Sequence, residues 1–240
     1  MLVLGFPAGS WATNCYLIAA AAGEPCIVVD PGQDSIDTLM SLVREHRLQP
    51  AAVALTHGHV DHVWSVAPVA AGFQIPAYCH PADAYRLADP AGTSIAATRE
   101  ALLAMTKGAL ELTEPEDLRM LGDDEDLQIA GLSLRARHAP GHTEGSIVLE
   151  HHGAAELFML SGDLLFAGSI GRTDLPGGDP DAMRQSLGRV VLHAPVDMTV
   201  YPGHGPSTSI GAELASNPFL QGLQAGRADG PGVSGRPRGL

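Results

Sequence analysis

The segment Thr56-His57-Gly58-His59-Val60-Asp61-His62 places three imidazoles and a carboxylate within six consecutive residues. It follows the apolar run 51–55, which predicts a buried strand with this segment at its C-terminal end. Side chains two apart on an extended backbone point the same way, so the first two histidines can reach one ion together. A helix that begins near Asp61 turns that carboxylate and His62 toward a second position. The spacing therefore predicts two neighbouring metal ions rather than one. Imidazole suits zinc, iron, nickel or copper, and the carboxylate admits the harder of these ions.

Three later residues complete this set, and each stands just after an expected strand. His142 lies in a Pro-Gly-His turn, from which its imidazole could complete a three-histidine set with His57 and His59. Asp163 has two carboxylate oxygens and can therefore bridge two cations. His204 lies in a second Pro-Gly-His turn and is the last ligand that the second position needs. We expect these residues to meet the His57–His62 cluster at one edge of the fold.

Other polar residues near these turns allow two interpretations each. Arg172, in a glycine-rich loop, could bind a substrate carboxylate through its two-pronged guanidinium or form a structural ion pair with Asp174. Asp30 could orient a metal-bound histidine or accept hydrogen bonds in the turn before Pro31-Gly32. Three further histidines are left outside the predicted site: His80, His151 and His152.

Composition limits the partners. The 240 residues carry a formal net charge of −13, which argues against nucleic acid or an anionic membrane surface and favours a small-molecule substrate. No apolar run reaches the length of a membrane span, and the N-terminus lacks the pattern of a signal peptide. Three cysteines in an irregular pattern predict no disulfide framework. A reducing cytoplasm is therefore expected, and the oligomeric state stays open.

Strands and helices are expected to alternate along most of the chain, as in an α/β fold. Residues 89–125 show a weaker pattern, with a helix possible over 97–112, and are interpreted as an insertion or lid. Residues 1–215 are expected to form one domain, and the Gly- and Pro-rich residues 216–240 a disordered tail. The expected strands are 15–20, 26–30, 51–55, 75–79, 127–129, 132–136, 146–150, 157–160 and 198–201, and the expected helices 36–43, 63–71, 82–87, a helix starting at 180 and one ending near 215.

The order and spacing of these ligands resemble the metallo-β-lactamase superfamily over residues 1–215. The resemblance implies a four-layer αββα sandwich, with His57, His59 and His142 on one metal and Asp61, His62 and His204 on the other. Asp163 would bridge the two ions, which are most simply zinc, with iron or a mixed pair as alternatives. The implied chemistry is attack by a metal-bridging hydroxide on an ester-like carbonyl, with Asp61 and Asp163 as the catalytic carboxylates.

Within the superfamily the sequence is most similar to the glyoxalase II-like group, the hydroxyacylglutathione hydrolases. Four segments carry this similarity: 13–16 (Thr-Asn-Cys-Tyr), 29–32 (Val-Asp-Pro-Gly), 162–166 (Gly-Asp-Leu-Leu-Phe) and 171–174 (Gly-Arg-Thr-Asp). The helical C-terminal domain with basic residues for glutathione has no counterpart, so the chain resembles the short single-domain bacterial type. The implied activity is hydrolysis of an acyl thioester of the S-lactoyl-thiol kind, with the thiol carrier undetermined.

Three alternatives remain from the sequence. A mononuclear iron persulfide dioxygenase shares the scaffold and a similar Gly-Arg-Thr-Asp loop, but its last histidine usually stands in a Pro-Ala-His-Asp-like turn rather than the Gly203-His204-Gly205 found here. A lactonase would use the same hydroxide to open a lactone. A non-catalytic metal-binding protein is the alternative of a different class, although the full set of ligand types argues against it.

Overall fold

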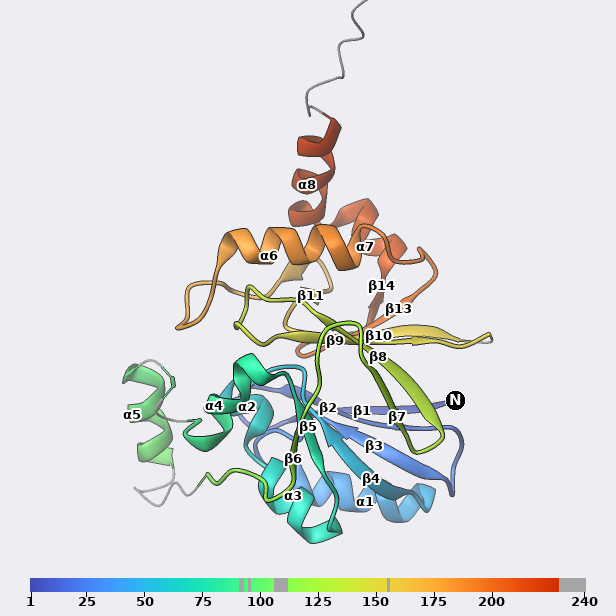
Figure 1. Ribbon diagram of the computed structural model, residues 1–240, viewed down its shortest axis with the longest axis vertical. Coiled ribbons are helices and arrows are strands. Elements are labelled where there is room, and N and C mark those ends of the chain that lie inside the picture. The colour runs from blue at the N-terminus through green and yellow to red at the C-terminus, as the bar shows by residue number, and fades with distance from the viewer. Residues whose placement is uncertain (91–92, 95, 106–111, 155, 229–240) are drawn as a thin grey trace, which may run out of the picture.

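Two six-stranded sheets stacked face to face form the middle of the computed structural model, which describes residues 1–90, 93–94, 96–105, 112–154 and 156–228 (Figure 1). The first sheet has the order β1-β2-β3-β4-β5-β6. Its first three strands are antiparallel and the rest run parallel to β3. The strands are β1 (Leu2–Ala8), β2 (Thr13–Ala19), β3 (Pro25–Val29), β4 (Gln49–Ala54), β5 (Ala77–Cys79) and β6 (Leu118–Met120).

The second sheet has the order β14-β13-β10-β9-β8-β7. All of its pairings are antiparallel except that of β10 with β13, so these two strands end at the same edge. A short ribbon, β11 (Leu165–Phe166) with β12 (Ser169–Ile170), follows β10. The sheet contains β7 (Asp126–Ile129), β8 (Leu132–His138), β9 (Ile147–His152), β10 (Leu157–Gly162), β13 (Thr199–Pro202) and β14 (Thr208–Ser209).

Helices cover the outer face of each sheet, which gives four layers (Figure 1). Helices α1 (Ile36–His46) and α3 (Val66–Phe73) pack on the first sheet, and α6 (Pro180–Ser186) with the π-helical turn η2 (Leu187–Val191) packs on the second. The other helical segments are α2 (Val60–Val63), η1 (Pro81–Asp83), α4 (Ala84–Ala88), α5 (Ala96–Met105), α7 (Ile210–Ser216) and α8 (Pro218–Ala228). No helix in the described ranges is long and apolar enough to cross a membrane.

The two-residue period of the strands divides the apolar side chains between the layers. In β2, Leu17 packs toward the helices on the first sheet, while Ile18 lies in the core between the sheets. In β10, Phe158 and Leu160 face that central core and Met159 faces the helices on the second sheet. Because these strands are buried on both faces, they appear in the sequence as continuous apolar runs. The predicted αββα sandwich is confirmed.

Most predicted elements are present with shifted ends, and the predicted start of a helix at residue 180 is confirmed. Asp179 accepts hydrogen bonds from the backbone N–H groups of Asp181 and Ala182, and Pro180 is the first helical residue. The N-cap of α7 is Ser209, whose hydroxyl accepts a hydrogen bond from the backbone N–H of Ala212. The cap of α1 is Ser35, but its hydroxyl makes no capping hydrogen bond.

Three predictions about the less regular parts of the chain are corrected. Strand β1 was not predicted, since Gly5 and Pro7 weaken its pattern; it lies at the sheet edge, where proline is tolerated. The segment interpreted as a lid contributes β6 to the first sheet, although α5 does lie outside the layers (Figure 1). Residues 216–228 are not a structureless tail, because they include α8, whose Leu220 is fully buried against the second sheet's helices. Residues 229–240 of the predicted tail, and 106–111 of the predicted helix 97–112, lie outside the described residues.

Candidate metal centre

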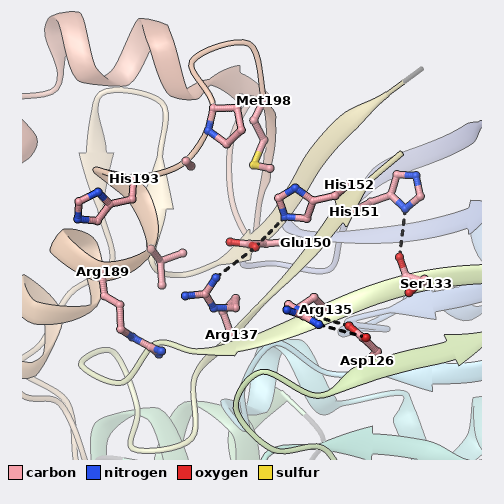
Figure 2. A pocket seen from close by; sticks show the side chains of 13 residues that line it. Asp126, Ser133, Arg135, Arg137, Glu150, His151, His152, Arg189, His193 and Met198 are labelled. Carbon is pink, nitrogen blue, oxygen red and sulfur yellow. Dashed lines mark hydrogen bonds and ion pairs between the residues drawn. The ribbon is translucent and has the colours of Figure 1, made fainter. Parts of the chain in front are cut away.

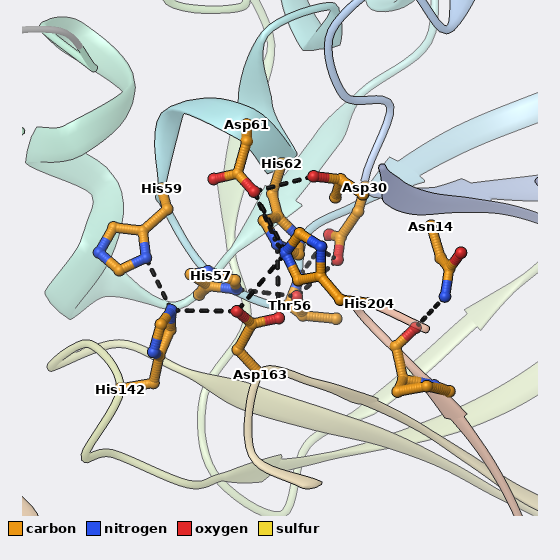
Figure 3. A network of polar contacts seen from close by, with 12 residues as sticks. Asn14, Asp30, Thr56, His57, His59, Asp61, His62, His142, Asp163 and His204 are labelled. Atoms are coloured by element: carbon orange, nitrogen blue, oxygen red, sulfur yellow. Dashed lines mark hydrogen bonds and ion pairs between the residues drawn. The ribbon is translucent and has the colours of Figure 1, made fainter. Parts of the chain in front are cut away.

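All seven side chains predicted as ligands converge at one edge of the sandwich (Figure 3). His57 and His59 follow β4, and Asp61 and His62 lie in the single turn of α2. His142 lies in the loop between β8 and β9, Asp163 follows β10, and His204 follows β13. Strands β4, β10 and β13 thus contribute ligands just beyond their C-terminal ends, the usual position of sites in α/β folds.

His57, His59 and His142 form the first ligand group. Their ring centroids lie 4.5 to 4.9 Å apart, with the rings nearly perpendicular to one another. His59 Nδ1 and His142 Nε2 are 2.7 Å apart. The alternation of His57 and His59 along an extended backbone therefore places both imidazoles beside the same point, as expected from the sequence.

Asp61, His62 and His204 form the second ligand group. The Nε2 atoms of His62 and His204 are 3.3 Å apart, and Asp61 Oδ2 lies 3.5 Å from the first and 3.3 Å from the second. The helical turn α2 begins at Val60 and rotates Asp61 and His62 away from the first group. The predicted change of backbone direction within the segment is confirmed.

Asp163 lies between the two groups. Its Oδ2 is 3.3 Å from His142 Nε2 in the first group and 3.7 Å from His204 Nε2 in the second. Its Oδ1 is 3.5 Å from His62 Nε2. One carboxylate thus reaches both groups, which is the geometry that a bridging ligand requires.

The chemistry of this cluster fits divalent cations. The donor atoms form three sets whose members all lie within 4.8 Å of one another: His57, His59 and His142; His57, His62 and Asp163; Asp61, His62 and His204. His57 Nε2 and Asp163 Oδ1 are buried and have no hydrogen-bond partner among the described residues. Buried polar atoms without partners are costly, and a cation at these positions would satisfy them. Imidazole nitrogens with carboxylate oxygens suit zinc or iron.

Outer hydrogen bonds orient three of the imidazoles. His62 Nδ1 lies 2.9 Å from Asp30 Oδ2, His142 Nδ1 lies 2.8 Å from the Arg172 carbonyl oxygen, and His204 Nδ1 lies 3.1 Å from the Trp11 carbonyl oxygen. Because each acceptor requires a proton on Nδ1, these contacts leave each Nε2 free to face the centre. Asp30 also accepts hydrogen bonds from the backbone N–H and hydroxyl of Thr56. Of its two predicted roles, Asp30 therefore orients His62.

The electrostatics of the two groups differ. Burial and the neighbouring imidazoles lower the pKa of His57 and His59 well below the usual histidine range. Burial also penalises the charged form of His62, but the carboxylates of Asp61 and Asp163 outweigh it and raise the pKa of His62 to about 10. The charge of His62 holds the pKa of Asp61 below its ordinary value despite burial. Hydrogen bonds to Asp61 from His204 and Thr13 act in the same direction.

Several residues that support the second group were not predicted individually. Thr13 Oγ1 donates to Asp61 Oδ2 over 2.8 Å. Asn14 Nδ2 donates to the carbonyl oxygens of Pro202 and Gly205, and the Tyr16 hydroxyl donates to that of Pro202. These hydrogen bonds hold the start of β2 against the turn that carries His204. The segment 13–16 was noted only through the family resemblance, because nothing in its local pattern indicates a partner far along the chain.

A hollow of about 230 Å³ opens onto the ligands, lined also by Trp11, Leu175 and Arg172. The Arg172 guanidinium forms two 2.7 Å contacts with Asp174, and its side chain is 59% exposed. The predicted ion pair of Arg172 with Asp174 is therefore present. Arg172 also lines the hollow, and its binding of a substrate carboxylate stays a prediction. The backbone carbonyl of Arg172, rather than its side chain, contacts His142.

The three histidines left outside the site are not part of either ligand group. His80 stacks on His138 at a centroid distance of 3.9 Å. His151 and His152 line a larger hollow of about 550 Å³ on the outer face of the second sheet (Figure 2). That hollow contains charged side chains, but they pair with one another: Arg135 with Asp126, and His152 and Arg137 with Glu150. The smaller hollow beside the converging ligands is the better candidate for chemistry.

Comparison with known proteins identifies the class. Residues 8–204 match the family model of the metallo-beta-lactamase superfamily, and the chain belongs to this superfamily. It is 42% identical over 227 residues to the uncharacterized protein Rv2581c of Mycobacterium tuberculosis, which covers 93% of this chain and 99% of that one. It is also 31% identical over 224 residues to the hydroxyacylglutathione hydrolase GloC of Haemophilus influenzae, which covers 89% and 95% of the two chains.

Solved structures agree with this assignment. The B3 metallo-beta-lactamase BLEG-1 has a TM-score of 0.75 and 34% identity, with 91% of this chain and 99% of that chain covered. The di-iron-bound form of TTHA1623 has a TM-score of 0.73 and 37% identity, with 91% and 100% covered. ETHE1 from Myxococcus xanthus, at 22% identity and a TM-score of 0.69, shares the fold.

Proposed function

We propose that this protein is a dinuclear metallohydrolase that cleaves acyl thioesters of the S-lactoyl-thiol type. The first metal would be held by His57, His59 and His142, and the second by Asp61, His62 and His204. The observation that carries the proposal is the position of Asp163, whose carboxylate lies within 3.7 Å of histidines from both groups. A complete second group favours two ions over the single iron of a persulfide dioxygenase.

Two divalent ions at these positions would activate water as a nucleophile and polarise the thioester carbonyl. The residues of the chain prepare the site for this. Asp163 and Asp61 would provide the negative charge to hold both cations, and Thr13 keeps the Asp61 carboxylate oriented. The hollow beside them would receive the acyl group, with Arg172 at its rim able to pair with a substrate carboxylate if the ion pair to Asp174 opens.

The thioester assignment rests on similarity together with this site. The relative GloC is described as a hydroxyacylglutathione hydrolase, and the 162–166 and 171–174 segments resemble those of that group. The metals are proposed to be zinc, with iron or a mixed pair as alternatives, because the donor set suits both and one related structure is di-iron-bound.

The test is thiol release from S-lactoylglutathione by protein saturated with zinc or iron, with metal content measured on the same samples. We expect release by the wild-type chain and by Asp126→Ala, which removes a surface carboxylate far from the ligands. Asp61→Ala should abolish release and lower the metal content. Two bound metals without release from any acyl thioester would refute the substrate class, and turnover of a lactone instead would favour the lactonase. A single iron in the active wild-type protein would refute the dinuclear centre.

A further inference from the structure

A buried ion pair lies directly behind the first ligand group, outside the predicted site. Asp83 ends the turn η1 and Arg86 lies in α4, and both side chains are at most 1% exposed. The Arg86 Nε and Asp83 Oδ1 atoms are 3.4 Å apart. Two charged groups buried this deeply are costly unless every charge finds partners, so their contacts indicate what they hold in place.

Asp83 accepts hydrogen bonds from both loops that carry the first group. Its Oδ2 accepts from the backbone N–H of Gly58 at 2.7 Å and from the hydroxyl of Thr143 at 2.7 Å. Its Oδ1 accepts from the backbone N–H of Gly145 at 2.8 Å. Gly58 lies between His57 and His59, and Thr143 directly follows His142. One carboxylate thus ties together two loops that are far apart in the sequence.

Arg86 continues the connection to a third loop at the rim of the hollow. Its Nη2 donates to the Pro176 carbonyl oxygen at 2.9 Å and to Glu144 at 2.6 Å. The side chain passes close to two glycines. A Cβ atom at Gly58 would lie 2.8 Å from the Arg86 stem, and one at Gly177 would lie within 2.3 Å of Nη2. Glycine at position 58 lets the backbone approach the arginine stem this closely, and the φ of +85° at Gly177 is one that glycine adopts without strain.

The geometry points to Asp83 as a positioning residue that sets the spacing between His142 and the pair His57 and His59, with Arg86 extending this support to the rim. The inference rests on the proposed function, because it takes these three histidines as ligands of the first metal. A buried carboxylate with three donors from two loops keeps its hydrogen bonds only while both loops stay in place. Its loss should therefore loosen the first group and leave the second, which contacts other residues, unchanged.

The variants are designed to separate a positioning role from general destabilisation. Asp83→Asn keeps the side-chain shape but replaces one accepting oxygen with a donor that faces a donor, and Asp83→Ala removes all three bonds. Leu127→Ala is the matched control, because it opens a cavity in the central core at β7, away from the ligands. Each change is made in two backgrounds: Asp61→Ala, which keeps the first group intact, and His59→Ala, which keeps the second.

The readout is the affinity for Zn²⁺ alone, measured by competition with a chromophoric chelator, together with the absorption spectrum of the Co²⁺ form. In the Asp61→Ala background, either Asp83 substitution should weaken zinc binding by about 10- to 100-fold, the range for outer partners of metal ligands, and shift the Co²⁺ spectrum. In the His59→Ala background the same substitutions should leave the zinc affinity within about twofold of that of His59→Ala alone. Leu127→Ala should lower thermal stability without changing affinity in either background.

The outcomes are distinguishable from a failure of the proposed function. If the wild-type chain binds no zinc, the metal centre itself is wrong. If it binds two ions and folded Asp83→Asn binds the first as tightly as wild type, the metal centre stands and the positioning role of Asp83 is overturned. Equal losses in both backgrounds would also overturn it, because they would show a general structural effect.

Discussion

Both ligand groups contain imidazoles, but they differ in composition and are supported in different ways. The first group has three buried or half-buried imidazoles, with Asp83 and Arg86 behind the loops that carry them. The second contains a carboxylate and is supported by Asp30, by the hydroxyl of Thr13 and by contacts from β2 to the turn of His204. Metal binding at each of the two positions can therefore be weakened separately, because the two groups share few supporting side chains.

Asp163 is the exception, and its removal should have the largest effect. Asp163→Ala should lose both metals, because this carboxylate lies beside histidines of both groups. A catalytic metal contributes several kcal/mol to transition-state stabilisation, so thiol release should fall by about 1000-fold or more. Metal analysis and single-substrate kinetics measure both losses. Full turnover by this variant would remove the two-metal interpretation.

Substitution of Asp30 should affect the second group in the way that substitution of Asp83 affects the first. Asp30→Asn weakens the contact that orients His62, so the affinity of the second metal should fall by about 10- to 100-fold. The affinity of the first metal should fall less, because Asp30 reaches that group only through the Thr56 hydroxyl beside His57. Zinc titration in the His59→Ala and Asp61→Ala backgrounds assigns the loss. A loss at the first position as large as that at the second would contradict the separation of the two groups.

The pH dependence of metal binding should also differ between the groups. In the metal-free protein the raised pKa of His62, about 10, keeps this imidazole protonated at neutral pH, so binding at the second position must displace its proton. Affinity there should rise by about tenfold or more per pH unit between about pH 7 and 9, because Asp61 and Asp163 also raise the pKa of His204 in the same group. The lowered pKa values of His57 and His59 leave them neutral, so the first position should show little dependence over this range. Calorimetry in buffers of different ionisation enthalpy counts the released protons, and equal proton release at both positions would contradict this difference.

The smallest effect is expected at His152. Its side chain is half exposed and contacts Glu150 on the outer face of the second sheet, away from both groups. His152→Ala should leave metal content and thiol release unchanged, and the free energy of unfolding should change by no more than about 0.5 kcal/mol. Lower metal content in this variant would show that the two groups are not the whole centre.

The order and spacing of the candidate ligands predicted that the seven would meet, and the resemblance to a known superfamily implied the four layers. Apolar runs such as 157–160 predict strands buried on both faces, and the two-residue spacing of His57 and His59 places both rings beside one point. The predictions failed where tertiary contacts decide the outcome. Strand β1 forms in spite of Gly5 and Pro7 because β2 offers it a full-length antiparallel partner, and α8 forms because Leu220 finds a buried position.

In the sequence, local spacing and side-chain chemistry determined which residues could bind two ions, and the superfamily resemblance that these residues carry implied the αββα class. Only the tertiary structure decided which outer residues support each group. Asp30 was open between two roles until its 2.9 Å contact with His62 was known, and Asp83 was not predicted at all. Their partners lie 25 to 62 residues away in the chain. No local pattern encodes such a contact, because it exists only when the buried carboxylate and its distant donors are brought together by folding.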